Sequence, residues 1–452
     1  MESKHVIGIL GGAVAGSEAA RVAAERGALV VVVEQGTRPY GKIEDGLPRW
    51  HVALRTKEFE KIDANLAHPN ILYVPSTRVG RDLSWEAFAG LGFSATVLAN
   101  GAWRDRPLPV VGIERFVGRG LIYQNAFVHW FNHAHECGYD GPRYVVPDRA
   151  IVVGGGLASI DVVKIINFEL YGAALAARGI HVDAEEMDHA GIPEICARHG
   201  IAAESLGIHG ATLFYRRRAE DMPLVAAEEG SARAAKVEQT RVKLLERVLK
   251  KYLVHFEPLC APLRPIVVPD VADGADGPGG ERLGGLVVSR QRQDGTREEL
   301  VVPSDLVVSS IGSIPEPIPG IPTVGEFFRW RDREAGELDL EGRSDVFGLG
   351  NVLTGKGNIV ESRKNAKRVM GQSADTRLGL AAVTSEGAAA TVDAMHAVAR
   401  AEADAVVTRA MAGAEALPEN AAAIKAWVLG RWAALGYGGY RTWIAAHRPV
   451  EA

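Results

Sequence analysis

The sequence predicts a mixed α/β fold, because one pattern of strand, glycine turn and helix occurs twice along the chain. The first copy covers residues 6–26 and the second covers residues 150–168. An apolar strand that runs directly into a glycine turn and a helix is typical of parallel strands with helices packed on the sheet. We therefore expect two doubly wound units, which fits a chain of 452 residues at about 150 residues per domain.

The first copy has the spacing of a dinucleotide-binding unit. Its apolar run at 6–10 leads into a turn from Gly11 to Gly16, and the next apolar run ends at Glu34. Such a turn lets a pyrophosphate approach the free N–H groups of the helix N-terminus, and the acid can accept hydrogen bonds from a ribose. The middle glycine of the G-x-G-x-x-G pattern is Ala13 here, which leaves less room for phosphates. The alternative is an ordinary α/β core turn without a ligand.

The second copy keeps both leading glycines, but its partner strand ends in arginines. Its turn contains Gly154, Gly156 and Ser159, and the partner strand at 211–215 is followed directly by the arginines 216–218. Guanidinium groups can bind a 2′-phosphate in a bidentate manner, whereas an acid would repel it. The pattern favours NADP over NAD. The alternative is a solvated run of surface arginines.

Two different dinucleotide sites in one chain indicate two cofactors that meet. A site that ends in an acid suits FAD and a site that ends in arginines suits NADPH, so hydride transfer from nicotinamide to flavin is expected. A third glycine-rich segment contains Gly350, Asn351, Gly357 and Ile359. We expect it to bring another helix N-terminus to the flavin, where it would stabilise negative charge.

The composition excludes several other classes of protein. With 51 basic and 56 acidic residues the formal charge is −5, which argues against nucleic acid as the main partner. The three cysteines form no C-x-x-C pair, so neither a zinc ribbon nor an iron–sulfur cluster bound by this chain is expected. Their pattern suggests a reducing, cytoplasmic location. No apolar stretch is long enough to span a membrane, and the run after Lys4 and His5 fits a strand better than a secretory signal.

Proline-rich segments mark where the chain is expected to cross between the two units. One contains Pro107 and Pro109, and the other covers residues 314–322. The predicted division is an FAD domain at 1–117 and 313–380, an inserted NADP domain at 118–312, and a helical C-terminal segment at 381–452.

The predicted inserted domain ends in strand-like sequence with a clear turn signal. Apolar runs lie at 285–290, 298–302 and 305–310, and an Asp-Gly turn separates the first two. We expect these three runs to form a β-meander.

At this point the chain resembles the adrenodoxin reductase and ferredoxin–NADP reductase A flavoproteins, which are related to the glutamate synthase small subunit. The resemblance runs along nearly the whole chain and rests on the segments 38–42, 48–51, 79–83, 126–132, 306–312 and 440–443. It implies an FAD domain with an inserted NADP domain, and electron transfer from NADPH through FAD to a ferredoxin.

The resemblance also implies roles for individual residues. The implied flavin contacts are Gly11, Gly16, Glu34, Gly41, Gly350, Gly357 and Ile359. The implied NADP contacts are Gly154, Gly156, Arg216 and Arg217. His51 matches a histidine near the flavin and nicotinamide, and Glu228 or its neighbour Glu229 matches an acid that faces the nicotinamide. The chain departs from the family at Ala13 and in the glycine-rich segment at 353–360, so the flavin pocket and the acceptor can differ.

A group of histidines and a basic helix are two further features of the sequence. His129, His133, His135 and Glu136 lie on one predicted helix, which the resemblance assigns to core packing, and no metal is expected. The basic helix at 233–251 is either a solvated face or a docking surface for an acidic ferredoxin.

The sequence leaves other functions open. An NADPH-dependent flavin or quinone reductase, an electron-input subunit of a larger complex, and a protein that senses NADP(H) without turnover all remain alternatives. The sequence does not predict the oligomeric state.

Overall fold

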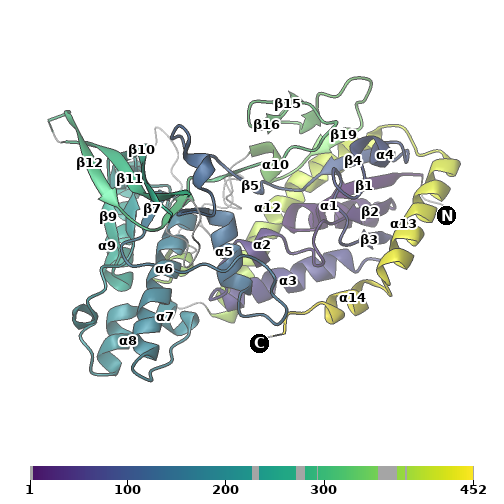
Figure 1. Cartoon of the computed structure of the whole chain (residues 1–452). Coiled ribbons are helices and arrows are strands. Elements are labelled where there is room, and N and C mark those ends of the chain that lie inside the picture. The colour runs from purple at the N-terminus through teal and green to yellow at the C-terminus, as the bar shows by residue number, and fades with distance from the viewer. Residues whose placement is uncertain are drawn as a thin grey trace.

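A seven-stranded sheet forms the centre of the first unit (Figure 1). The computed structural model describes residues 4–225, 234–270, 280–292, 294–354, 374–381 and 384–450. The sheet contains β1 (Val6–Leu10), β2 (Leu29–Val33), β3 (Ile71–Val74), β4 (Ala95–Leu98), β17 (Trp330–Asp332), β18 (Glu337–Leu338) and β19 (Val346–Gly348). Its order is β17-β18-β19-β4-β1-β2-β3, and the five strands from β19 to β3 are parallel. Segments far apart in the sequence thus build one sheet.

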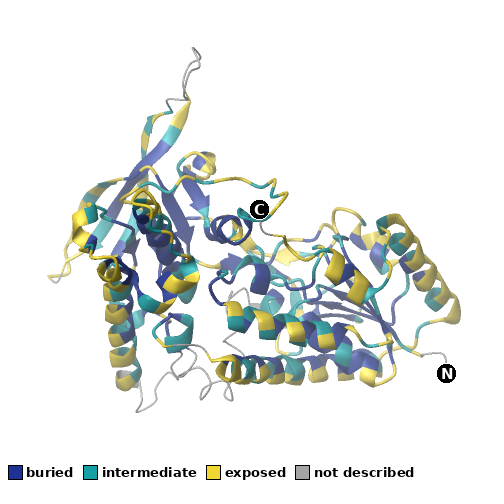
Figure 2. Ribbon diagram, turned by 90° about the horizontal axis from the view of Figure 1, so that it is seen from below, coloured by how far each residue is buried: buried dark blue, intermediate teal, exposed yellow. Residues whose placement is uncertain are grey.

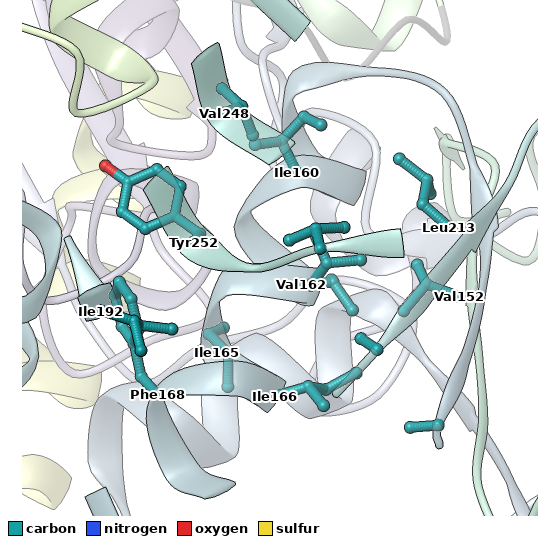
Figure 3. Close-up of a cluster of buried hydrophobic side chains, with 14 of the residues drawn as sticks. Val152, Ile160, Val162, Ile165, Ile166, Phe168, Ile192, Leu213, Val248 and Tyr252 are labelled. Atoms are coloured by element: carbon teal, nitrogen blue, oxygen red, sulfur yellow. The ribbon is translucent and has the colours of Figure 1, made fainter. Parts of the chain in front are cut away.

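The second unit has a parallel sheet of its own. Its strands are β6 (Leu121–Tyr123), β7 (Ile151–Gly154), β8 (Thr212–Phe214), β9 (His255–Glu257) and β13 (Val307–Ser310). Their order is β6-β13-β7-β8-β9, and every pairing is parallel. The helix α6 (Leu157–Ala176) packs on this sheet and is buried along most of its length, because its sequence is apolar on nearly every side. Figure 3 shows Ile160, Val162 and Ile166 among the strand residues Val152 and Leu213.

The predicted β-meander is wrong in its third strand. The second unit carries a separate antiparallel ribbon of β10 (Cys260–Pro269), β11 (Glu281–Gln291) and β12 (Arg297–Pro303). The third predicted run contains β13, which is buried at every residue and belongs to the parallel sheet. A strand buried on both faces is typical of a parallel sheet. The true first strand, β10, was missed because its prolines indicate a loop; it lies at an edge, with register shifts near Pro262 and Pro265.

Two short strands lie where the chain crosses between the units. β5 (Arg104–Asp105) and β14 (Ser313–Ile314) pair antiparallel, so the outgoing and returning segments run side by side. The crossing lies close to the segments that the prolines predicted. The exact domain limits, at 117 and 313, stay a prediction.

The helical C-terminal segment covers the first unit. It contains α12 (Ser385–Ala412), α13 (Pro418–Leu435) and α14 (Tyr440–Ala446). Ala403, Val406 and Val407 of α12 join the core of the first sheet, and exposed positions lie along the outer faces of the helices (Figure 2). The described helices include none with both the length and the apolar character needed to cross a membrane.

Candidate functional site

The first glycine turn joins β1 to α1 (Val14–Glu25) and is packed too tightly for side chains. Gly11 has a φ of +98°, and a Cβ on it would lie 2.6 Å from the carbonyl oxygen of Ala99. A Cβ on Gly16 would lie only 1.8 Å from the carbonyl oxygen of Gly11. Both glycines are therefore required by the shape of the turn itself.

We expect Gly16→Ala to destabilise the first unit by about 3 kcal/mol and to lose any cofactor bound at the turn, because the new methyl overlaps the Gly11 carbonyl. Gly430→Ala is the matched control, since a Cβ on Gly430 of α13 would meet no atom of the described residues within 4 Å. Urea unfolding and retained cofactor measure the two effects. A Gly16→Ala protein that equals the control in both would contradict this account of the turn.

The substitution at Ala13 is accommodated by a second glycine. Ala13 is the N-cap residue of α1 and supplies no side-chain cap, so the first-turn N–H groups stay free of a capping side chain. Its methyl lies 3.1 Å from the position that a Cβ on Gly41 would occupy, and Gly41 has a φ of +52°. The missing side chain at Gly41 gives the methyl of Ala13 its room.

Glu34 connects the end of β2 to the glycine turn. Its Oε2 accepts a hydrogen bond from the Gly12 N–H at 2.8 Å, and its Oε1 accepts one from the Gly36 N–H at 2.9 Å. Burial raises the pKa of Glu34, although the backbone hydrogen bonds oppose that shift. Each oxygen keeps a further lone pair, so the side chain can also accept a hydrogen bond from a ribose hydroxyl.

A cavity of about 930 Å³ opens at this turn. Five of the predicted site residues line it, namely Gly11, Glu34, Gly41, Gly350 and Asn351. Gly16 is not among the lining residues, and its role is to allow the close packing of the turn. The Oδ1 of Asn100, which also lines the cavity, is buried without a hydrogen-bond partner among the described residues. The free helix N-terminus, the buried acid and this unpaired oxygen suit a dinucleotide, and the volume is in the usual range of ligand pockets.

The predicted contacts Gly357 and Ile359 lie outside the described residues. The third helix N-terminus, which the sequence predicts to follow them, therefore stays a prediction.

Sequence reasoning missed much of the cavity wall. One side consists of α12 residues with mainly small or apolar side chains, including Ala394, Met395, Ala397, Val398, Ala401 and Ala405. The alanine-rich composition of this segment was the available signal, because small side chains allow a helix to approach a ligand closely.

Sequence reasoning also missed the importance of Lys42. It begins α2 (Lys42–Asp45) and lines the cavity, and its Nζ donates hydrogen bonds to Asn125 Oδ1 at 3.1 Å and Ser313 Oγ at 2.9 Å. Burial lowers the pKa of Lys42 to about 8 and raises the pKa of the nearby Asp105 to about 6. Lys42 therefore joins the first unit to the crossing segments by an amine that titrates near neutral pH.

The second glycine turn joins β7 to α6. The hydroxyl of Ser159 accepts a hydrogen bond from the Gly156 N–H at 2.8 Å and donates one to the Gly156 carbonyl at 2.9 Å. Ser159 is fully buried, so its hydroxyl fixes the turn from inside. A Cβ on Gly155 would meet the Tyr215 ring at 2.1 Å, whereas a Cβ on Gly156 would meet no described atom within 4 Å. The Tyr215 ring therefore covers the turn at Gly155, whereas the turn is open at Gly156.

The three arginines after β8 are exposed but not equivalent. Arg218 forms an ion pair with Asp221 at 2.9 Å. Arg216 and Arg217 form no side-chain hydrogen bond or ion pair with any residue that the structure describes. These two guanidinium groups are therefore available to an anionic ligand.

His51 lies at the boundary between the units, away from the walls of the first cavity. It is the N-cap residue of α3 (Val52–Leu66) and is buried. Its Nε2 accepts a hydrogen bond from Trp50 Nε1 at 3.1 Å and lies 4.0 Å from Asp161 Oδ1 in the first turns of α6. Glu228 and Glu229 lie outside the described residues.

Comparison with known proteins supports this fold. No family model matches the chain. Over 145 residues it is 25% identical to mitochondrial NADPH:adrenodoxin oxidoreductase of Arabidopsis thaliana, covering 32% of this chain and 29% of that protein. Over 165 residues it is 27% identical to the small chain of NADPH glutamate synthase of Mycobacterium tuberculosis, covering 35% and 32%. These matches span about a third of each relative.

The structural likeness covers nearly the whole chain. The solved structure of Mycobacterium tuberculosis FprA in complex with NADPH matches 94% of this chain and 90% of its own, with a TM-score of 0.55 and 21% identity. The predicted fold class is confirmed. The predicted resemblance to adrenodoxin reductase and to the glutamate synthase small subunit is also confirmed, because the chain matches one relative with each of these names.

Proposed function

We propose that the protein is an FAD-containing oxidoreductase that takes a hydride from NADPH and delivers single electrons to a ferredoxin-like iron–sulfur protein. The observation that carries this proposal is the difference between its two glycine turns. One ends at a buried acid beside a large cavity, and the other is followed by two exposed arginines that pair with no described residue. We also propose that residues 1–117 and 313–380 form the FAD domain and residues 118–312 the NADP domain.

Each turn has a defined task in this proposal. At the first turn, the α1 N-terminus would hold the pyrophosphate of FAD and Glu34 a ribose hydroxyl. At the second turn, the α6 N-terminus would receive the pyrophosphate of NADPH, and Arg216 and Arg217 its 2′-phosphate. Bound FAD would supply a group that accepts a hydride and releases single electrons.

Groups at the boundary would position the reacting ends of the cofactors. His51, beside Asp161 of α6, and Glu228 would orient the nicotinamide or adjust protonation near the flavin. The pKa of about 8 means that Lys42 can hold or release a proton beside the first cavity near neutral pH.

The visible spectrum of the purified protein tests the proposed cofactor. We expect flavin bands at close to one flavin per chain, and FAD rather than FMN on release by denaturation. A colourless protein that still binds NADPH would contradict the enzyme and favour a protein that senses NADP(H).

The proposed docking surface for an acidic partner lies on α9 (Ala234–Tyr252). Several of its cations already have structural roles, since Arg241 and Lys251 bind backbone carbonyls and Arg247 pairs with Asp375. The exposed cations without an ion pair to a described residue are seven positions apart on one helix face, namely Lys236, Lys243 and Lys250. Arg233 lies outside the described residues.

We expect Lys243→Glu to slow electron transfer to an acidic ferredoxin about tenfold at low salt, because charge complementarity mainly affects the association rate. Lys425→Glu on α13 is the control, with the same charge change on another exposed helix. Stopped-flow rates at low and high ionic strength measure the effect. Equal rates for both variants, or a rate independent of salt, would remove α9 as the docking surface.

A further inference from the structure

We propose that Asp45, His129 and His133 form a binding site for a divalent transition-metal ion of the zinc type between α2 and α5 (Gln124–His133). His129 and His133 are four residues apart on one face of α5, with ring centroids 4.5 Å apart. Asp45 ends α2, which lies beside α5 (Figure 1). One potential ligand atom from each of the three residues lies within 4.8 Å of the other two.

The orientation of the His133 ring is the one that a metal ligand adopts. Its Nε2 lies 3.0 Å from Asp45 Oδ1, and its Nδ1 lies 2.8 Å from Glu136 Oε1. Histidines that bind metals usually donate the N–H of the other ring nitrogen to a carboxylate, which fixes the tautomer. Glu136 is placed to hold the Nδ1 proton, so the Nε2 lone pair of His133 would face the group formed by Asp45 and His129.

The site has room for an ion and a further ligand. A second cavity of about 640 Å³ is lined by Asp45, His129, His133 and Glu136. Two imidazoles and one carboxylate are a typical protein ligand set for zinc, with the fourth position left to water. Imidazole ligands favour zinc, copper and nickel over magnesium and calcium.

A site without metal explains only part of this arrangement. Without a metal, the His133 ring bridges the two carboxylates through its contacts with Asp45 Oδ1 and Glu136 Oε1. That arrangement gives no role to His129, which hydrogen-bonds to no residue that the structure describes. A metal ion between the three residues would bind a ring nitrogen of His129 as well.

An ion at this place would connect the two units. Asp45 belongs to α2, the short helix of the first unit that begins at Lys42. His129 and His133 belong to α5, the helix that follows β6 of the second sheet. The contact there is already polar, since Asn132 Nδ2 donates hydrogen bonds to the carbonyls of Glu44 and Leu47. The metal would add coordinate bonds across an interface that is otherwise held by hydrogen bonds and packing.

Metal titration of the full-length, tag-free protein tests the proposal. After treatment with a chelator, we expect saturable binding of one Zn²⁺ per chain, and Co²⁺ bound at the same site should show absorption typical of low coordination number. His129→Ala should abolish this binding, and Glu136→Gln should weaken it about 10- to 100-fold. His199→Ala is the control, because His199 is exposed and lies elsewhere on the second unit.

The variants separate a built site from surface histidines. His129 is exposed, so its replacement should leave thermal unfolding in the absence of metal unchanged. Zn²⁺ should raise the midpoint of unfolding of the wild type and of His199→Ala but not of His129→Ala. Absence of saturable binding, or equal binding by His129→Ala and the wild type, would overturn the proposal whatever the flavin content.

Discussion

Replacing Arg216 and Arg217 together by alanine is expected to lower kcat/KM for NADPH by at least about 100-fold, while kcat/KM for NADH stays nearly unchanged. Each charge-assisted hydrogen bond to a phosphate contributes about 1.5–3 kcal/mol, and every 1.4 kcal/mol corresponds to about tenfold. Both guanidinium groups are exposed and lack an ion pair with a described residue, so their loss should cost little stability. Steady-state kinetics with the two nucleotides measures the effect.

Arg218→Ala is the matched control for that experiment. Arg218 has the same charge and follows in sequence, but its guanidinium is held by Asp221. We expect its removal to change the preference for NADPH much less. If the double variant kept the wild-type preference, or if Arg218→Ala reproduced the full loss, the assignment of the 2′-phosphate site would be wrong.

Replacing His396 by alanine is expected to lower the free energy of unfolding of the first unit by about 3–5 kcal/mol. His396 of α12 is buried, and its Nδ1 lies 2.7 Å from Glu18 Oε1 and its Nε2 2.9 Å from Glu58 Oε2. Glu18 and Glu58 are both buried as well, so the variant would leave two carboxylates without their shared cation. Urea unfolding measures the loss.

A variant in which apolar residues replace Glu18, Glu58 and His396 together is the informative control. Replacing mutually paired buried ionic groups together by apolar groups is often nearly neutral, whereas removing one member is costly. Arg400, which lies 3.6 Å from Glu18 Oε2, keeps its ion pair with Glu25 in that variant. The triple variant should therefore recover most of the stability that His396→Ala loses. Equal stability of His396→Ala and the wild type would show that the cluster does not hold α12 in place.

The same cluster gives a pH dependence with a definite sign. Burial alone would lower the pKa of His396, but its hydrogen bonds to Glu18 and Glu58 raise that pKa to about 9. Because the unfolded value is about 6.5, the stabilisation of about 3 kcal/mol is complete below pH 6.5 and is lost as the pH rises through 9. His396→Ala should lack this decline in unfolding measured across the same pH range.

The sequence predicted those parts of the fold that depend on local pattern. The strands at 6–10 and 71–74 are observed with the predicted limits, because uninterrupted apolar runs next to glycine or proline mark buried strands well. The first turn was also predicted, and Gly11, Glu34 and Gly41 do line one cavity.

Features that depend on contacts between distant segments could not be predicted from the sequence. Nothing local distinguishes β13 from a third ribbon strand, since only its pairing with β6 and β7 places it in the parallel sheet. The ion cluster of His396 joins side chains 378 and 338 positions apart in the sequence. Lys42 and Asn125 likewise meet only when the two units pack together.

Anaerobic mixing of the purified protein with NADPH tests the central claim most directly. The account predicts that NADPH bleaches the flavin absorption completely in a single turnover, and that NADH does so far more slowly. Oxidised ferredoxin added afterwards should restore the absorption. A flavin that stays oxidised in the presence of excess NADPH would contradict transfer between the two sites.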